Sequence, residues 1–228
     1  MPSIRSRQSP EYRKLRDELL EAEGALAEQR ECVADLRRRL PGGTKLEVDY
    51  VFAEGPPDLA RNSASDFSET RLSDLFAAGK NELILQHMMF APGAEKGCPM
   101  CSLWADGFDG MAHHLIDRVN FAVVTRAPIA KLRDWGRARG WRRLRLLSSH
   151  ATSFNDDFGV ELAEDRQLPA LSVFTREENG DILHFYTTEG SLAERHHRAM
   201  DLYCPVWNLL DLLPGGRGDW MPRHFYHE

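Results

Sequence analysis

The sequence predicts an α/β domain with a central mixed sheet flanked by helices, and a long helix before it. Between residues 82 and 147, strand-like apolar runs alternate with helical patterns, which favours parallel strands joined by right-handed crossovers. Further on, Asn179-Gly180 separates two more strand-like runs, as in an antiparallel hairpin. Near the N-terminus, apolar residues recur in alternating steps of three and four, which is typical of a coiled-coil helix.

Length and composition limit the possible classes of protein. The 228 residues, of which 42% are hydrophobic and 28% charged, are enough for one substantial domain with additions. We expect a helical extension over residues 1–43 and a domain over residues 44–228 that ends in a helical tail. A net charge of −6 argues against nucleic-acid binding, although residues 133–145 are locally basic. No apolar N-terminal signal and no membrane-length apolar run is visible, so we expect a cytoplasmic protein without a membrane partner.

The first predicted helix begins at Ser9-Pro10-Glu11, where an N-cap, a first-turn proline and an acid follow one another. It should end at Pro41-Gly42-Gly43. Its apolar seam, interrupted only by Gln29, consists of Tyr12, Leu15, Leu19, Ala22, Leu26, Val33, Leu36 and Leu40. This seam either packs along the chain's own domain or pairs with a second chain to form a homodimer.

The run over residues 82–90 is apolar on both faces, as expected of a central strand covered by helices. Gln86 and His87 are its polar exceptions. A histidine inside a sheet commonly contributes a hydrogen bond to packing. His87 nevertheless lies near the C-terminal end of the strand that leads to two cysteines, and it is therefore the leading candidate for a proton carrier.

Periodicity and turn residues predict, in chain order, a strand at 47–52, a loop at 54–69, a helical turn at 72–76, a helix after residue 98, a strand at 119–125, a helix at 129–139, strands at 144–147, 171–174 and 182–187, and a helix at 191–213 broken at Pro205. Asp106 and Asp109 are expected to face solvent.

The polar loop 148–159 follows a strand at the C-terminal edge of the sheet, where ligands collect in open α/β sheets. His150, Asn155 and Asp156 either line a cleft there or form turns.

The residues with the clearest chemistry are Cys98 and Cys101, in the segment Gly97-Cys98-Pro99-Met100-Cys101. They follow a predicted strand and begin a predicted helix, with Pro99 suited to the first helical position. Unpaired N–H groups and the positive end of the macrodipole favour a thiolate at such a helix start. Cys98 is therefore the expected nucleophile, and Cys101, one turn further along the same face, is the expected resolving thiol.

Two other readings of the motif remain open. The cysteines could be half of a zinc site or two incidental buried thiols. Structural zinc needs four ligands, usually from a second pair at similar spacing, which the chain lacks. Cys32 and Cys204 are isolated, and His113-His114 would lie roughly 18 Å down the helix at ~1.5 Å per residue. We therefore expect neither a metal nor another cofactor.

The order of strand, Cys-x-x-Cys helix, crossover and proline-led hairpin resembles the thioredoxin fold. In particular, the chain is similar to an uncharacterised bacterial thioredoxin-like family known as a domain of unknown function. The matching segments are Leu72-Ser73-Asp74-Leu75-Phe76, Cys98-Pro99-Met100-Cys101-Ser102 with Trp104, Asp106-Gly107-Phe108, Asn155-Asp156-Asp157-Phe158-Gly159, Ser172-Val173-Phe174 and Pro214-Gly215-Gly216-Arg217.

The resemblance implies a role for Pro169, which precedes the predicted strand at 171–174. In thioredoxins a cis-proline at the equivalent place faces the thiols and helps to hold the backbone of the partner. Two departures bear on function. The residues between the cysteines are Pro99-Met100, closer to the Pro-Tyr of glutaredoxins than to the Gly-Pro of thioredoxins. Gly97 replaces the tryptophan that usually precedes the first cysteine.

The hypothesis from these residues is thiol–disulfide exchange with a protein or small-molecule disulfide or thiol substrate. Cys98 would attack, Cys101 would resolve and Pro169 would position the substrate. One alternative is a thiol peroxidase of the peroxiredoxin type, in which Cys98 passes through a sulfenic acid. The other is a non-enzymatic metal-binding or interaction module on the same fold.

Overall fold

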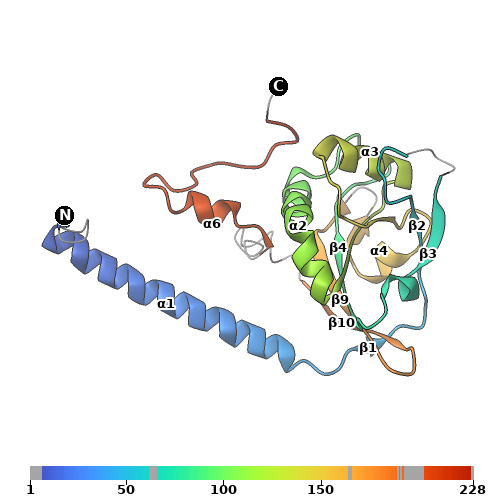
Figure 1. Ribbon diagram of the computed structural model, residues 1–228, viewed down its shortest axis with the longest axis horizontal. Helices are drawn as coiled ribbons and strands as arrows, with labels where there is room; N and C mark the ends of the chain where they lie inside the picture. Colours follow the sequence, from blue (N-terminus) through green and yellow to red (C-terminus); the bar gives the residue numbers. More distant parts are fainter. Residues whose placement is uncertain are drawn as a thin grey trace. The chain divides into compact units, whose positions relative to one another are not determined.

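The computed structural model describes residues 7–61, 66–163, 166–188, 190, 192 and 203–226 (Figure 1). The chain divides into two compact units, residues 1–42 and residues 43–228. No helix in the described ranges is long and apolar enough to cross a membrane.

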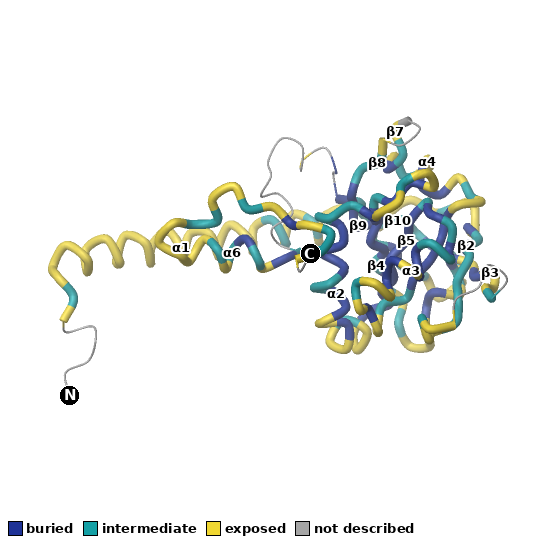
Figure 2. The backbone as a smooth tube through the Cα atoms, turned by 90° about the horizontal axis from the view of Figure 1, so that it is seen from above, coloured by how far each residue is buried: buried dark blue, intermediate teal, exposed yellow. Residues whose placement is uncertain are grey.

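In the first unit, helix α1 runs from Pro10 to Arg38 and starts where the sequence predicts. The Ser9 hydroxyl accepts a hydrogen bond from the Tyr12 N–H at 3.0 Å, which satisfies one of the free donors of the first turn. Arg37 and Arg38 lie in the last turn, where the helix dipole favours positive charge. No residue of α1 is buried, and Figure 2 shows exposed residues along the helix.

The second unit is built on a sheet whose strands are β1 (Thr44–Lys45), β2 (Val51–Glu54), β3 (Ser68–Arg71), β4 (Glu82–His87), β5 (Asn120–Thr125), β6 (Leu146–Ser148), β9 (Ala170–Arg176) and β10 (Ile182–Thr187). Their order across the sheet is β1-β10-β9-β4-β5-β6-β2-β3. The pairs β4–β5 and β5–β6 are parallel, and the other pairs of this sheet are antiparallel. A separate small pair joins β7 (Glu161–Ala163) to β8 (Arg166–Gln167).

The helices of this unit are the 3₁₀ turn η2 (Leu72–Leu75), α2 (Pro99–Arg118), α3 (Ile129–Arg139), α4 (Phe154–Asp157) and α6 (Val206–Leu210). β4, α2 and β5 form a parallel crossover unit, and the β9–β10 hairpin pairs with the other side of β4. The central order β10-β9-β4-β5, with α2 following β4, is that of the thioredoxin fold. The predicted fold class, a thioredoxin-like domain with a mixed sheet and a long N-terminal helix, is confirmed.

The sheet separates two hydrophobic cores. On one face, Phe108 of α2 and Leu132 of α3 pack with Phe121 and Val123 of β5. On the other face, Leu72, Leu75 and Phe154 from η2 and α4 pack with alternate strand residues such as Leu83, Leu85, Ala122 and Val124. Because side chains alternate along a strand, neighbouring residues of β4 point into different cores.

Several boundaries differ from the predictions. The segment predicted as a loop at 54–69 contains the start of β3, which has exposed polar residues and so carries no apolar strand signal. β4 ends at His87, because the chain leaves the ladder to form the loop before α2. Most of the helix predicted at 191–213 lies outside the described residues, and α6 follows Pro205.

Candidate thiol site

Cys98 and Cys101, called the thiol site below, lie where β4 leads through a loop into α2. The first helical residue is Pro99, and Cys98 occupies the N-cap position with φ −54° and ψ 130°. This confirms the placement of Cys98 at a helix start. Both cysteines are free thiols, Cys98 partly buried and Cys101 fully buried. Cys98 is therefore more accessible than Cys101.

The first turn of α2 is held by Ser102. Its N–H and its hydroxyl both donate to the carbonyl oxygen of Cys98, at 2.9 and 2.8 Å. The same hydroxyl accepts a hydrogen bond from the indole N–H of Trp135 on α3, at 3.0 Å. On β4, the Gln86 amide donates to the carbonyl oxygen of Cys101 at 3.0 Å. Groups from β4 and α3 thus fix the backbone of both cysteines.

The loop before Cys98 is attached to the sheet and to α3. The Cys98 N–H donates to the Met89 carbonyl oxygen at 2.9 Å, which closes the loop. The Thr125 hydroxyl at the end of β5 donates to the Phe90 carbonyl oxygen at 3.0 Å. Lys131 of α3 donates to the Pro92 carbonyl oxygen at 2.9 Å. These bonds pre-organise the approach to the thiol site.

The two thiols have opposite electrostatic environments. A hydrogen bond from the Cys101 thiol lowers the pKa of Cys98 from its ordinary 9.0 to about 7. Burial opposes this lowering, and the backbone N–H groups of Cys101 and Met100 add to it. The same hydrogen bond and full burial raise the pKa of Cys101 well above its ordinary value. Near neutral pH the first proton therefore leaves from Cys98.

Gly97 lies in a closely packed position directly before Cys98. A Cβ added there would overlap the methyl group of Met88 and would lie 3.0 Å from Nε1 of Trp135. The absence of a side chain lets the Trp135 indole reach Ser102. Gly97 is therefore part of the local packing, and the indole beside the thiol site comes from α3.

The C-terminal segment covers this packing. The His224 ring nitrogen Nε2 and the Gly97 carbonyl oxygen are 3.1 Å apart. The rings of His224 and Phe225 each meet Trp135 at a centroid distance of 5.8 Å. Arg139 of α3 pairs with Asp106 and donates to the His224 carbonyl oxygen. Residues close to the C-terminus therefore contact the loop that carries Cys98.

His87 does not join the thiol site. Its Nε2 lies 2.7 Å from the Ser172 hydroxyl, and its ring stacks on Phe154 in the core on the opposite side of the sheet from Cys101. Burial, and secondarily the nearby His184, lower the pKa of His87 to about 3. The structure therefore does not bring the expected proton carrier to the thiols.

Pro169 directly precedes β9, in which Ala170 pairs with His87 at the end of β4. It therefore enters the sheet at the same end as the loop that carries Cys98. No peptide bond in the described residues is cis, so Pro169 is trans. The cis geometry implied by the resemblance to thioredoxins is absent.

The polar loop 148–159 is held by a hydrogen bond within the loop and by contacts with Arg126, which follows β5. The Asn155 side-chain oxygen accepts from the Ser149 hydroxyl at 2.7 Å, and Asp156 pairs with Arg126 at 2.9 Å. His150 Nδ1 lies 3.2 Å from the Arg126 carbonyl oxygen. We had expected His150, Asn155 and Asp156 either to line a cleft or to form turns, and these bonds are those of turn formation.

The expectation that Asp106 and Asp109 face solvent is wrong. Asp109 is buried, and its Oδ1 accepts hydrogen bonds from the N–H groups of Arg142, Arg143 and Leu144 at 2.8, 2.7 and 3.3 Å. Asp106 accepts from the Trp141 indole at 2.7 Å, besides its ion pair with Arg139. Both carboxylates therefore attach α2 to the segments beside it.

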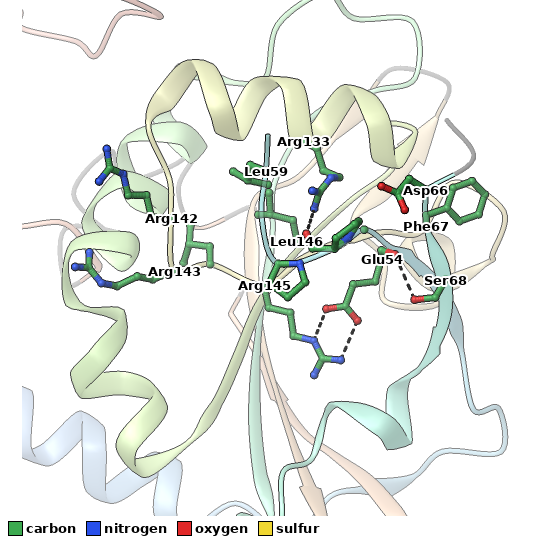
Figure 3. Close-up of a pocket in the computed structure, with 14 residues that line it drawn as sticks. Glu54, Leu59, Asp66, Phe67, Ser68, Arg133, Arg142, Arg143, Arg145 and Leu146 are labelled. Atoms are coloured by element: carbon green, nitrogen blue, oxygen red, sulfur yellow. Dashed lines mark hydrogen bonds and ion pairs between the residues drawn. The ribbon is translucent and has the colours of Figure 1, made fainter. Parts of the chain in front are cut away.

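A pocket of about 720 Å³ lies elsewhere, between the β2–β3 connection, α3 and the start of β6 (Figure 3). Two arginines that line the pocket, Arg133 and Arg145, already bind other groups of the protein. Arg145 makes two bonds to Glu54, at 2.5 and 2.8 Å. Arg133 donates to the carbonyl oxygens of Pro56, Asp58 and Arg61. Arg142 and Arg143 point away from the pocket in Figure 3. The contacts of Arg133 and Arg145 indicate that these two side chains stabilise the fold around the pocket.

Sequence reasoning did not assign roles to Ser102, Trp135, His224 and Phe225. Ser102 adjoins the motif, and Trp135 lies in the helix predicted at 129–139, but neither position specifies a hydrogen bond between two helices. Gln86 was visible as a polar residue in an apolar strand. His224 and Phe225 lie in a short tail without periodicity, where the sequence offers no comparable signal.

The chain was compared with curated proteins, with solved structures and with protein-family models. A search of curated proteins finds no match to the chain. Similar solved structures include Plasmodium yoelii Prx1a, at 16% identity and a TM-score of 0.45 over 81% of this chain and 98% of that one. Vibrio vulnificus Prx3, reduced and in complex with H₂O₂, matches at 18% identity and a TM-score of 0.45 over 64% of this chain and 85% of that one.

The fold assignment rests on the strand order β10-β9-β4-β5 with α2 after β4, and not on the similarity to these solved structures. The match that covers nearly the whole chain is to a family model, over residues 1–227. Its description is "Bacterial protein of unknown function (DUF899)". The chain therefore belongs to the bacterial protein family DUF899.

Proposed function

We propose that the protein is a thiol–disulfide oxidoreductase in which Cys98 is the nucleophile and Cys101 the resolving thiol. The Cys98 thiolate attacks one sulfur of a substrate disulfide, forming a mixed disulfide and releasing the other substrate sulfur as a thiolate. Cys101 then attacks the Cys98 sulfur, its proton passing to a substrate thiolate. The substrate gains two electrons and leaves as one thiol and one thiolate, which takes up from solvent the proton that Cys98 had released, while Cys98 and Cys101 become a disulfide. A dithiol or thiol reductant restores the starting state.

The observation that carries the proposal is the unequal environment of the two sulfurs. Cys98 is partly exposed with a pKa of about 7, whereas Cys101 is fully buried with a raised pKa. At neutral pH a substantial fraction of Cys98 is thiolate, and the attacking thiol is most effective when its pKa is near the ambient pH. Substrate meets Cys98 first, and Cys101 is held one turn away.

The substrate would approach at the end of the sheet where the Cys98 loop and the start of β9 lie. Pro169 is the proposed contact for the substrate backbone, since it immediately precedes β9 and carries no N–H donor. His87 has no part in this proposal, because its ring lies in the opposite core.

The test treats the reduced full-length protein with oxidised glutathione and maps its thiols by mass spectrometry. The wild type should form a Cys98–Cys101 disulfide that dithiothreitol reverses. Cys101→Ser should stop at a glutathione adduct on Cys98, and Cys98→Ser should form neither product. The exposed Cys32 provides the matched control through Cys32→Ser, which should behave like the wild type. A wild type without the Cys98–Cys101 disulfide would contradict the proposal.

A second readout measures the electrostatic argument. Cys101→Ala removes the hydrogen bond that contributes most to lowering the pKa of Cys98. The apparent pKa of Cys98, from its alkylation rate against pH, should therefore rise from about 7 toward the ordinary value of 9.0. An unchanged value would show that Cys101 does not activate Cys98.

A peroxide is the alternative electron acceptor. In that reaction the Cys98 thiolate attacks one oxygen of hydrogen peroxide, and the O–O bond breaks to give a sulfenic acid and hydroxide, which takes a proton from solvent. The sulfenic acid then condenses with the Cys101 thiol to a disulfide and water. Hydrogen peroxide consumption that greatly exceeds that of a free thiol, with slow reaction toward glutathione disulfide, would replace the oxidoreductase assignment with a peroxidase.

A further inference from the structure

Helix α1 carries a heptad repeat that runs through it without insertion or deletion. Written as a to g, the core positions within α1 are a at Tyr12, Leu19, Leu26 and Val33, and d at Leu15, Ala22, Gln29 and Leu36. The 29 residues of α1 span about 43 Å at ~1.5 Å per residue. We propose that α1 pairs with α1 of a second copy of the chain, in a parallel and in-register two-stranded coiled coil.

The apolar seam of α1 is exposed along the helix. Leu19 is 51% exposed and Leu26 53% exposed, and no residue of α1 is buried. An isolated helix in water is only marginally stable from propensity alone, so most helical stability comes from packing of the apolar face. The apolar seam of α1 therefore needs a packing contact that the helix does not supply by itself.

The spacing identifies the occupant as another helix. On a straight α-helix a strict seven-residue repeat rotates by ~20° per heptad, so it faces one direction only when the helix supercoils with a partner. Within the described residues the next longest helix is α2, whose apolar face already packs in the sheet domain. A helix with the same length and the same repeat is α1 of a second copy.

Gln29 sets the direction of the pair. In a parallel, in-register dimer each d residue meets its own counterpart, so the two Gln29 side chains face each other and can share a hydrogen bond. In an antiparallel dimer d residues meet a residues, and every a residue of α1 is apolar. Gln29 would then be buried against an apolar side chain without a partner, which costs free energy.

Two further features agree with a parallel pair. A β-branched residue at an a position with leucine at the next d position, as in Val33 and Leu36, favours two strands in a parallel coiled coil. Flanking charges meet from g to the following e position, which places Glu11 beside Arg16 of the second copy. The like-charged combination of Glu18 and Glu23 is offset within each helix, because Lys14 pairs with Glu18 at 3.9 Å and Arg16 with Glu23 at 3.2 Å.

The first experiment compares Leu19→Glu with Leu20→Glu by light scattering and sedimentation of the full chain. Both leucines are exposed, at 51% and 58%, but only Leu19 lies on the seam. The wild type and Leu20→Glu should have twice the 26.0 kDa mass of one chain, and Leu19→Glu should have the single mass. Circular dichroism and melting of the sheet domain establish that the variants fold. A monomeric wild type, or a dimer that survives Leu19→Glu, would overturn the proposal.

The second experiment tests direction, using Cys32→Ser as background. Leu15→Cys places a thiol at d, where a parallel pair brings the two copies together, so mild oxidation should yield a covalent dimer linked through residue 15. Leu20→Cys, outside the seam, should yield much less. If the protein is dimeric but Leu15→Cys does not cross-link, the parallel arrangement is wrong. The proposal is independent of the chemistry assigned to the thiol site.

Discussion

At the scale of single residues, Cys98 and Cys101 have the same side chain but different proton affinities. The difference comes from one shared hydrogen bond, which stabilises a thiolate on Cys98 and retains the proton on Cys101. Burial raises both pKa values. For Cys98 the hydrogen bond outweighs burial, whereas for Cys101 the hydrogen bond and burial both raise the pKa. The different proton affinities of the two thiols therefore depend on the position of each residue in the first turn of α2.

His87 yields a prediction about stability. Its pKa falls from the ordinary 6.5 to about 3 in the folded protein, mainly because the ring is buried. Between these values the unfolded chain binds a proton at this position and the folded chain does not. The free energy of unfolding should therefore decrease as pH falls from about 6.5 toward 3. Each unit of pKa difference corresponds to at most about 1.4 kcal/mol.

His87→Gln tests this assignment, because the amide can still bond to Ser172 but does not titrate. Urea unfolding of both proteins at several pH values should show a flatter pH dependence for the variant in the acidic range. Parallel curves for the two proteins would mean that His87 does not bind the proton responsible.

At the scale of elements, strand alternation decides which residues can serve the thiol site. Gln86 and His87 are neighbours in β4, but their side chains point to opposite faces of the sheet. Gln86 bonds to the carbonyl oxygen of Cys101, while His87 stacks on Phe154. Sequence distance from the cysteines alone therefore does not distinguish them.

The loop between β4 and α2 offers a test with a matched control. In Gly97→Ala the added methyl group overlaps Met88 and approaches Trp135 closely, so the buried packing under Cys98 must shift. We expect a loss of about 1–3 kcal/mol in unfolding free energy and a changed alkylation rate of Cys98. Gly93→Ala changes the same loop at a site with no neighbouring atom within 4 Å, and both quantities should stay near the wild type. Equal effects at the two glycines would rule out the packing explanation.

At the scale of the whole molecule, the thiol site combines groups that are distant in sequence. Trp135 of α3 bonds to Ser102 of α2, and His224 approaches Gly97. Lys96 also lies over the Phe225 ring, 5.7 Å from its centroid. The last described residues therefore restrict the surroundings of a thiol more than 120 positions earlier, as His224 and Gly97 are 127 residues apart.

Removal of this cover should expose Cys98. A chain ending at Met221 loses His224 and Phe225, and at fixed pH its Cys98 should be alkylated several-fold faster than in the wild type. Leu212→Ala, at an exposed site in the same C-terminal segment, is the control and should leave the rate unchanged. An unchanged rate in the shortened chain would mean that the tail does not limit access to Cys98.

The sequence alone was informative wherever a feature depends on local spacing. The start of α1, the limits of α3 and the position of Cys98 before α2 follow from capping residues, periodicity and glycine, and the structure has them in place. The β2–β3 hairpin was harder, because β3 is short and mostly exposed and gains its stability from β2. Asp109 was misjudged, since the three N–H groups it binds come from residues 142–144.

The order of strands and helices, the thioredoxin-like class and the location of two thiols at a helix start were determined by the sequence itself, because they depend on short-range periodicity and on turn chemistry. The tertiary structure decided that Gln86 and not His87 faces the thiols, that Trp135 supports their turn, and that the C-terminal segment covers them. Such contacts depend on which faces of the sheet and helices meet in space, and local spacing along the chain does not contain that information.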